Sequence, residues 1–309
     1  MLIKNTGQRF YPSVVLLACF VLIWATPVPA EDPVRRGEYV FRLAGCLGCH
    51  TDSEHHGATL AGGRALATPF GTFYTPNITP DPVHGIGKWR EEDFFRAVTL
   101  GIGVKTGHYF PVFPYPAYTR ISQNDLYALW AFLRTVPAVA QANKPHEVPW
   151  YLGSIASWGW QLLFFKPGVE PVQPTPGQSP AWQRGEYIAK ALAHCGECHT
   201  PRTRFGTLDR ALSYAGTPQG PEGAVVPNIT PDPKTGIGQW TQTDLVDFFK
   251  DGGLPNGDFT GGLMAEVIDN GLKYLTHEDA EALATYIKSL PSMEHDVSRK
   301  KKAATPSKP

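Results

Sequence analysis

Two copies of the motif Cys-x-x-Cys-His constrain this 309-residue chain more than any other feature, one over residues 46–50 and one over residues 195–199. Two intervening residues let one helical turn present both thiols to a porphyrin edge, where each joins a vinyl group as a thioether. The histidine that follows then lies beneath the ring and binds the iron. The motifs predict two covalently bound haem c groups, attached through Cys46, Cys49, Cys195 and Cys198, with His50 and His199 as axial iron ligands.

Paired cysteines also occur in disulfides, in redox-active sites and in zinc sites. A thioredoxin-like pair would follow a strand, and a four-cysteine zinc site would need both pairs close in space. Here the pairs lie 149 residues apart in matching sequence contexts, each with a histidine directly after it. These features favour haem attachment.

The first thirty residues have the pattern of a secretory signal peptide. A basic start precedes an apolar run of 12 residues, Val14 to Ala25, and small residues then precede Glu31. The run is short against the ~20 residues that cross a bilayer. We expect cleavage after Ala30 and a location in the periplasm or on the periplasmic face of the inner membrane. The alternatives are an uncleaved membrane anchor or a lipobox ending at Cys19.

Charge is unevenly distributed along the chain, although 28 basic residues balance 28 acidic ones. Two of the basic residues lie in the leader and five in the last eleven positions, which leaves 21 basic against 28 acidic residues over 31–298. We expect residues 293–309 to form a basic, disordered tail. The alternative is a weak contact of this tail with anionic lipid or an acidic partner.

An internal repeat divides the chain into two halves. Arg-Gly-Glu-Tyr occurs at 36–39 and 184–187, and Asn-Ile-Thr-Pro-Asp-Pro occurs at 77–82 and 228–233. Each copy of the longer motif continues through Gly-Ile-Gly to a tryptophan, Trp89 or Trp240. A duplication of this length indicates two complete domains rather than a solenoid. We place haem domain 1 at residues 31–137, a connector at 138–180 and haem domain 2 at 181–292.

Helical patterns dominate both halves. A short helix leads into each haem motif, a second begins near Glu91 or Thr243, and a last one follows a capping signal at Ser122 or Thr276. Apolar residues of the last helix recur on one face, namely Leu126, Leu129 and Leu133 in the first half and Ala280, Leu283 and Ile287 in the second. No alternating strand pattern is found, so the predicted fold class is all-α, with two tandem domains wrapped around haem.

The connector is rich in proline and aromatic residues, among them Trp150, Tyr151, Trp158, Trp160, Phe164 and Phe165. A flexible linker would be polar and rich in Gly and Ser. We interpret the connector as a strap that packs on both domains and fixes the distance between the haems. A loop that covers one domain is the alternative.

The second haem has an evident distal ligand. Methionine is a common sixth ligand of electron-transfer haems, and it raises their potential. Apart from the initiator, the chain has Met293, beyond the last helix, and Met264, which lies 65 residues after His199 and before that helix. We predict Met264 as the sixth ligand of the second haem. A core methionine is the alternative.

The first half contains no methionine after the initiator, and an offset of 151 residues puts Phe113 where Met264 lies. Phenylalanine cannot bind iron, so the first haem is either five-coordinate or held by another side chain. His108 lies five residues before Phe113 and is the first candidate for its sixth ligand, with His84 second. His55 and His56 follow the attachment motif so closely that we expect them at the surface.

The motifs together resemble a known family. The two haem motifs, the repeated Asn-Ile-Thr-Pro-Asp-Pro segment and the aromatic-proline segment 109–116 are similar to the multihaem cytochrome c subunits of membrane-bound bacterial alcohol and aldehyde dehydrogenases, and to their diheme relatives. The resemblance covers roughly residues 33–292 and implies class I cytochrome c domains. Two departures are evident: the alcohol dehydrogenase subunits carry three haem motifs, and they have methionine where this chain has Phe113.

The resemblance implies electron transfer as the function. A diheme cytochrome of this kind would take electrons from a dehydrogenase partner and pass them to quinone, a terminal oxidase or another cytochrome, at or near the membrane surface. No catalytic residue is assigned, since no triad, hydride-cofactor fingerprint or phosphate loop is found, and neither enzyme activity nor nucleic acid binding is expected. The alternative is a haem enzyme acting at an open first haem, such as a peroxidase or a thiosulfate dehydrogenase.

Overall fold

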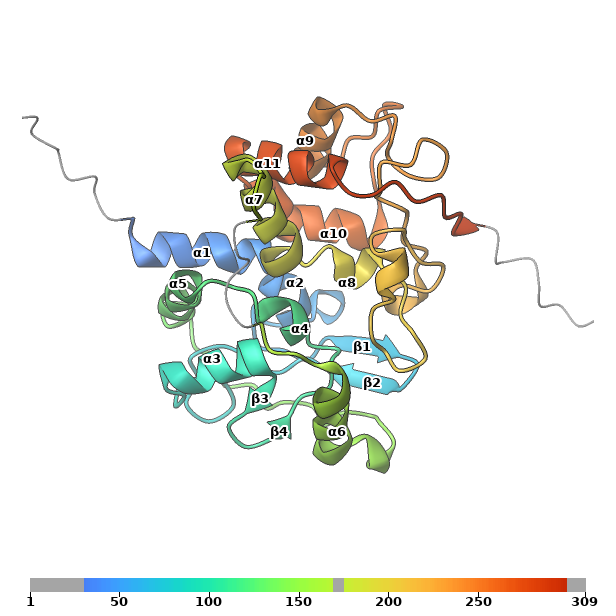
Figure 1. Ribbon diagram of the computed structural model, residues 1–309. Coiled ribbons are helices and arrows are strands. Elements are labelled where there is room, and N and C mark those ends of the chain that lie inside the picture. The colour runs from blue at the N-terminus through green and yellow to red at the C-terminus, as the bar shows by residue number, and fades with distance from the viewer. Residues whose placement is uncertain (1–30, 169–174, 299–309) are drawn as a thin grey trace, which may run out of the picture. The chain divides into compact units, whose positions relative to one another are not determined.

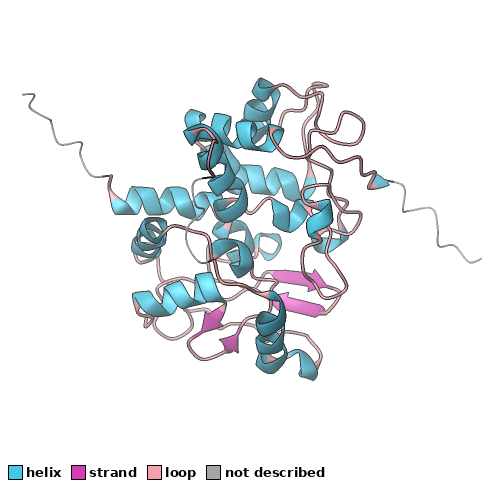
Figure 2. Ribbon diagram, viewed as in Figure 1, coloured by secondary structure: helices cyan, strands magenta, loops and turns pink. Residues whose placement is uncertain are grey.

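The computed structural model describes residues 31–168 and 175–298 (Figure 1). The predicted signal peptide, residues 169–174 of the connector and residues 299–309 of the basic tail lie outside the described residues. From Asp32 onward the chain forms one compact unit. Helices dominate this unit, as Figure 2 shows, which confirms the mostly helical fold class.

The first half begins with α1 (Pro33–Leu43), which leads into the short α2 (Cys46–His50) of the first haem motif. The remaining helices of this half are α3 (Glu91–Leu100), α4 (Tyr115–Tyr118) and α5 (Gln123–Leu133). The connector contributes α6 (Ser154–Phe164). Single turns of 3₁₀ helix occur at Ser53–His55 and Trp150–Leu152.

The second half repeats this order. It begins with α7 (Pro180–Tyr187), which continues as a turn of π-helix (Ile188–Leu192) and leads into α8 (Gly196–His199) of the second haem motif. The later helices are α9 (Gln242–Asp251), α10 (Gly262–Asn270) and α11 (His277–Lys288). Short 3₁₀ turns lie at Arg210–Leu212, Pro221–Gly223 and Leu272–Tyr274.

The first half also contains two small antiparallel hairpins, which the sequence does not predict and which are compatible with the mostly helical fold class (Figure 2). One pairs β1 (Ala65–Thr68) with β2 (Gly71–Tyr74), and the other pairs β3 (Ile102–Gly103) with β4 (Gly107–His108). These strands span two to four residues, which is too short for alternation of apolar residues to be visible in the sequence.

The predicted capping signals act as expected. Ser122 Oγ accepts a hydrogen bond from Asp125 N (3.2 Å) at the start of α5, and Thr276 Oγ1 accepts one from Asp279 N (3.1 Å) at the start of α11. The apolar faces predicted for these two helices are buried. Both helices therefore begin where the sequence indicates and pack against the core.

The glycine of the repeated Arg-Gly-Glu-Tyr motif lets the first and last helices of each half approach closely. A Cβ atom at Gly37 would lie 1.9 Å from the carbonyl oxygen of Ala128, and one at Gly185 would lie 1.9 Å from that of Ala282. The arginine of the motif pairs with an aspartate of the same half, Arg36 with Asp125 and Arg184 with Asp279. These pairs fix α1 on α5 and α7 on α11.

The tyrosine of the motif reaches into the other half. Tyr39 donates a hydrogen bond to Asp279 Oδ2 (2.5 Å), and Tyr187 donates one to Asp125 Oδ2 (2.6 Å). The two halves thus exchange equivalent contacts, as the subunits of a twofold dimer do. The sequence repeat shows that this tyrosine recurs but gives no indication that it crosses between halves.

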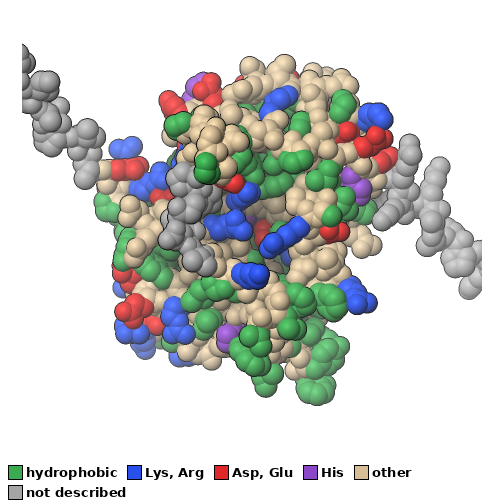
Figure 3. Space-filling model, in the orientation of Figure 1, with side chains coloured by type: hydrophobic (Ala, Val, Ile, Leu, Met, Phe, Trp, Pro, Cys, Tyr) green, Lys and Arg blue, Asp and Glu red, His purple; other side chains and the backbone are tan. Residues whose placement is uncertain are grey.

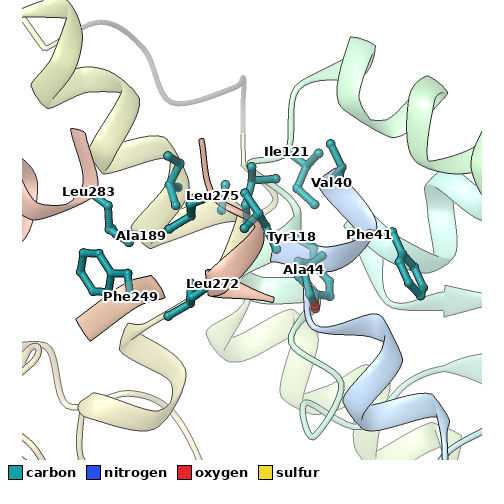
Figure 4. Packing of buried hydrophobic residues seen from close by; sticks show 14 of the residues in the cluster. Val40, Phe41, Ala44, Tyr118, Ile121, Ala189, Phe249, Leu272, Leu275 and Leu283 are labelled. Atoms are coloured by element: carbon teal, nitrogen blue, oxygen red, sulfur yellow. The ribbon is translucent and has the colours of Figure 1, made fainter. Parts of the chain in front are cut away.

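The hydrophobic core is continuous across both halves (Figure 4). Val40, Tyr118 and Ile121 of the first half belong to the same buried cluster as Ala189 and Leu275 of the second. Contacts of α1 and α4 with the π-helical turn join the two sides of this cluster. The division into two tandem domains stays a prediction, since the described chain from Asp32 onward forms a single unit.

Helix α6 contacts both halves. Gln161 on α6 donates to Gly101 O (3.1 Å) in the first half, and Trp160 Nε1 donates to Phe205 O (2.8 Å) in the second.

Among the residues that the structure describes, no helix has the length and apolar character needed to cross a bilayer.

Candidate haem attachment sites

The two motifs form short helical turns that present their thiols side by side. The four motif cysteines are free thiols; Cys46 and Cys49 lie on α2, Cys198 lies on α8 and Cys195 directly precedes α8. Burial raises the pKa of Cys46 and Cys195 to about 12 and that of Cys198 to about 11. Cys49 is exposed, yet desolvation by the surrounding protein raises the pKa of its thiol as well. A thiol that is both accessible and desolvated is expected on the wall of a concave surface.

Both motif histidines are oriented by a backbone carbonyl. His50 Nδ1 lies 2.8 Å from Pro76 O, and His199 Nδ1 lies 2.9 Å from Pro227 O. A carbonyl can only accept, so Nδ1 carries the proton and the lone pair is left on Nε2, the tautomer that binds a metal. Burial lowers the pKa of both rings, which keeps them neutral.

The repeated Asn-Ile-Thr-Pro-Asp-Pro segment explains why these carbonyls are held in place, since it begins directly after Pro76 and Pro227. Asn77 Oδ1 accepts hydrogen bonds from the backbone and the hydroxyl of Thr79 (2.9 and 2.7 Å), and the equivalent bonds recur in the second copy. Asp81 in turn accepts from two backbone N–H groups that follow it. The segment is a rigid loop that positions the acceptor of each ligand histidine.

The π-helical turn before α8 accounts for a difference between the halves. Tyr39 precedes Cys46 by seven residues, whereas Tyr187 precedes Cys195 by eight. A π-turn accommodates one extra residue without breaking the helix. The second helix can therefore lead into its attachment turn as the first does, despite the extra residue. His194 then takes the left-handed position (φ 38°) that Gly45 (φ 66°) takes in the first half.

His194 and Tyr118 lie between the two attachment turns. Their rings are 5.3 Å apart in an edge-to-face arrangement, and the Tyr118 hydroxyl donates to Ala44 O (2.5 Å) directly before the first motif. Burial lowers the pKa of His194 and raises that of Tyr118. Neither residue is predicted from the sequence, although the position of His194 directly before Cys195 is a usable signal.

Met264 lies in the first turn of α10, half-buried against the hydrophobic core. The preceding loop carries a bridge between Gly253 and Phe259, which corresponds at an offset of 151 residues to the pairing of β3 with β4 in the first half. The same offset relates Met264 to Phe113. The element order therefore agrees with the predicted correspondence of these two positions.

The four histidines of the first half other than His50 occupy different settings. His108 ends β4, and its Nδ1 lies 2.5 Å from Gln161 Oε1 on α6. His55 pairs with Asp52 and is largely exposed, and His56 is also exposed, as expected. His84 is half-buried in the loop after the Asn-Ile-Thr-Pro-Asp-Pro segment.

Arg64 connects helix α10 to the first attachment turn, a role that the sequence does not indicate. Arg64 donates to Gly48 O (2.7 Å) in the middle of the first motif and forms an ion pair with Glu266, two residues after Met264. It also pairs with Glu222. The helix that carries Met264 is thus fixed to the turn that carries Cys46 and Cys49.

The donor set fits a c-type haem at each motif, because two thiols and a neutral imidazole with a free Nε2 are present together. Such turns in a mostly helical fold define a c-type cytochrome. No protein-family model matches the chain, but individual proteins do. The "Diheme cytochrome c-type" of Cereibacter sphaeroides is 37% identical over 298 residues, which cover 91% of this chain and 97% of that protein.

Subunits of dehydrogenases are similar to the chain as well. The cytochrome c subunit of alcohol dehydrogenase (quinone) from Gluconacetobacter polyoxogenes is 37% identical over 273 residues, and the gluconate 2-dehydrogenase cytochrome c subunit from Pantoea cypripedii is 38% identical over 269 residues. The matches cover 86% and 83% of this chain but only 58% and 59% of those proteins. The chain belongs to this family of diheme cytochromes and dehydrogenase cytochrome c subunits.

Proposed function

We propose that the protein is a periplasmic diheme cytochrome c that accepts electrons from a dehydrogenase partner and delivers them to the respiratory chain through quinone, a terminal oxidase or another cytochrome. The observation that supports this most directly is the pair of oriented, neutral ligand histidines, His50 and His199, each following two free thiols. The names of the relatives supply the class of the partner.

Two haem c groups, when bound, supply one-electron redox centres. Cys46, Cys49, Cys195 and Cys198 would attach them, His50 and His199 would each bind one iron, and Met264 would be a further ligand of the second iron. In this proposal each half of the chain is one haem domain, and α6 with its connector is the strap that joins them. The contacts of α6 with Gly101 and Phe205 support that role.

For the first haem we propose His108 as the sixth ligand. Gln161 Nε2 donates to Gly101 O, so its Oε1 faces His108 as an acceptor. His108 Nδ1 must then carry the proton, and its Nε2 keeps the lone pair that a metal requires. This is the same device that orients His50 and His199, with a side-chain amide in place of a backbone carbonyl.

The protein residues between the motifs perform the remaining tasks of an electron-transfer site. Buried Tyr118 and half-buried His194 place two aromatic rings between the attachment turns. Arg64 and its partner Glu266 hold α10 against the first turn. Well-packed surroundings of this kind keep the reorganisation that accompanies electron transfer small.

The proposal is tested on the mature holoprotein by mass spectrometry and by a redox titration followed in the visible and near-infrared. We expect the added mass of two haems and two one-electron steps, with electrons accepted from a dehydrogenase of the class that the relatives' names give, supplied with its substrate. A colourless protein, or one that dehydrogenase and substrate leave fully oxidised, would contradict it.

A further inference from the structure

The burial pattern of helix α6 is the reverse of that of an ordinary surface helix. Its polar residues Ser157 and Gln161, one turn apart, are buried at 2% and 8% exposure. Six apolar residues of α6 and the turn before it point outward instead, with exposed fractions from 51% to 92%: Trp150, Tyr151, Ile155, Trp158, Leu162 and Leu163. Surface helices normally bury their apolar stripe and expose the polar one. We name these six residues the α6 patch.

The side chains of the patch lie together and form one exposed hydrophobic area. Figure 3 shows hydrophobic side chains massed over the region of α6 at one end of this face. No charged residue occurs between Glu147 and Lys166. Phe205 adds to the area, because it is half exposed and its ring stacks on Phe164 at the end of α6 (5.6 Å). Contiguous exposed apolar surface of this kind marks an interaction site.

Most charges around the patch are positive; the exception is Glu147, three residues before Trp150, whose carboxylate accepts a hydrogen bond from the Tyr74 hydroxyl. Lys105 on the neighbouring hairpin, Lys166 after α6 and Arg204 beside Phe205 are exposed and form no ion pair within the described ranges. Segments 101–122 and 148–168 and residues 200–208 contain no Asp or Glu, although the body of the chain is acidic overall. Figure 3 shows Lys and Arg side chains across the middle of the face, next to the hydrophobic area.

We propose that the α6 patch rests on an anionic lipid bilayer, with its leucine and isoleucine side chains in the acyl boundary and its tryptophans and tyrosine at the headgroup level. Amphipathic aromatic rings prefer that level, and flanking cations attract acidic headgroups. An uncharged patch with a basic rim fits a bilayer surface better than a protein surface, which would offer polar partners.

The proposal stands apart from electron transfer, because lipid binding is measured without turnover. The probe is a vesicle of equal parts phosphatidylethanolamine and phosphatidylglycerol, compared with phosphatidylcholine alone, in a sedimentation assay with the mature holoprotein. We expect binding to the anionic vesicle, weakened by salt. The triple variant Ile155→Ser, Leu162→Ser, Leu163→Ser should bind at least ~10-fold more weakly, and loss of each rim cation should cost ~5-fold.

The matched control is Val83→Ser, Val225→Ser, Phe259→Ser, which makes the same chemical change at exposed positions outside the patch and should bind as the wild type does. A chain that ends at Ser298 removes the basic tail and should keep the patch-dependent part of the binding. Unchanged haem spectra show that each variant is folded. The proposal is overturned if neither vesicle binds, if patch and control variants lose equally, or if the patch variant loses only binding to the partner dehydrogenase.

Discussion

At the scale of single residues, one hydrogen bond decides which nitrogen of a histidine is free to bind iron. For His50 and His199 the acceptor is a backbone carbonyl, which no side-chain substitution removes. For His108 the acceptor is the Gln161 side chain, which is itself held by Gly101 O. In the ligation proposed for the first haem, a side chain of the connector therefore fixes the tautomer of the ligand.

We predict that His108→Phe makes the first haem high-spin and able to bind carbon monoxide, while the second haem keeps its spectrum. The reason is that phenylalanine fills the space but offers no lone pair. Resonance Raman and carbon monoxide difference spectra measure the change. The control is His84→Phe, in the same half; if that variant, and not His108→Phe, opens the iron, His84 is the ligand.

The substitution Met264→Phe gives the second half the residue that the first half has at the corresponding position, Phe113. We expect this variant to lose the methionine–iron charge-transfer band in the near-infrared. The potential of the second haem should also fall by on the order of 0.1 V, since axial ligands span about 0.8 V. Met293→Leu is the matched control, because the hydrogen bonds of Met293 with Asn228 and Thr230 are made by its backbone, which the substitution keeps. An unchanged band in Met264→Phe would exclude Met264 as a ligand.

At the scale of elements, the two halves are joined by the reciprocal tyrosine contacts of α1 and α7. Tyr39→Phe and Tyr187→Phe should each lower the free energy of unfolding by about 2 kcal/mol, because each removes a hydrogen bond to an ionised carboxylate. Urea unfolding followed by far-ultraviolet circular dichroism measures this loss.

Tyr127→Phe serves as the control for both variants, since that hydroxyl is bonded to Gln123 on its own helix and is 41% exposed. We expect a change of less than ~0.5 kcal/mol for it. Equal effects for all three tyrosines would show that the contacts between the halves contribute no special stability.

The sequence predicted helices well where a local signal marks them. Ser122 and Thr276 gave the starts of the last helices, and the repeat gave the matching order of elements. It could not predict the hairpins, which are too short for a periodic pattern, or the crossing of Tyr39 and Tyr187. The sequence also gives no indication of the role of Arg64. Its partners Gly48 and Glu266 belong to no pattern that includes Arg64, and only folding brings the three residues together.

At the scale of the whole molecule, the continuous core and the exchanged tyrosines join the elements that carry the two haem motifs. The repeat alone suggests two haem proteins in tandem, each stable by itself. Instead, α10 of the second half contacts α2 of the first, and Arg64 fixes this contact from the first half. A change at one site is therefore expected to be felt at the other through packed elements.

This coupling predicts how stability depends on pH. Burial by itself would raise the pKa of Asp279, but its bonds to Arg184 and Tyr39 lower the pKa below the ordinary value. A carboxylate with a lowered pKa in the folded state stabilises the fold above the ordinary pKa, and this contribution is lost as the pH falls through the lowered value. Unfolding should therefore become easier on the acid side, where the contact between halves fails.

In Asp279→Asn this acid dependence should be reduced, since an amide cannot take up the proton. The variant should also be less stable at neutral pH by about 2–3 kcal/mol, because Arg184 loses a charged partner. Urea midpoints measured from neutral pH down to about pH 3, below the ordinary Asp pKa, test both effects. Asp247→Asn, an exposed aspartate on α9, should leave the slope unchanged. If Asp279→Asn keeps the full acid slope, titration of Asp279 is not what makes the stability depend on pH.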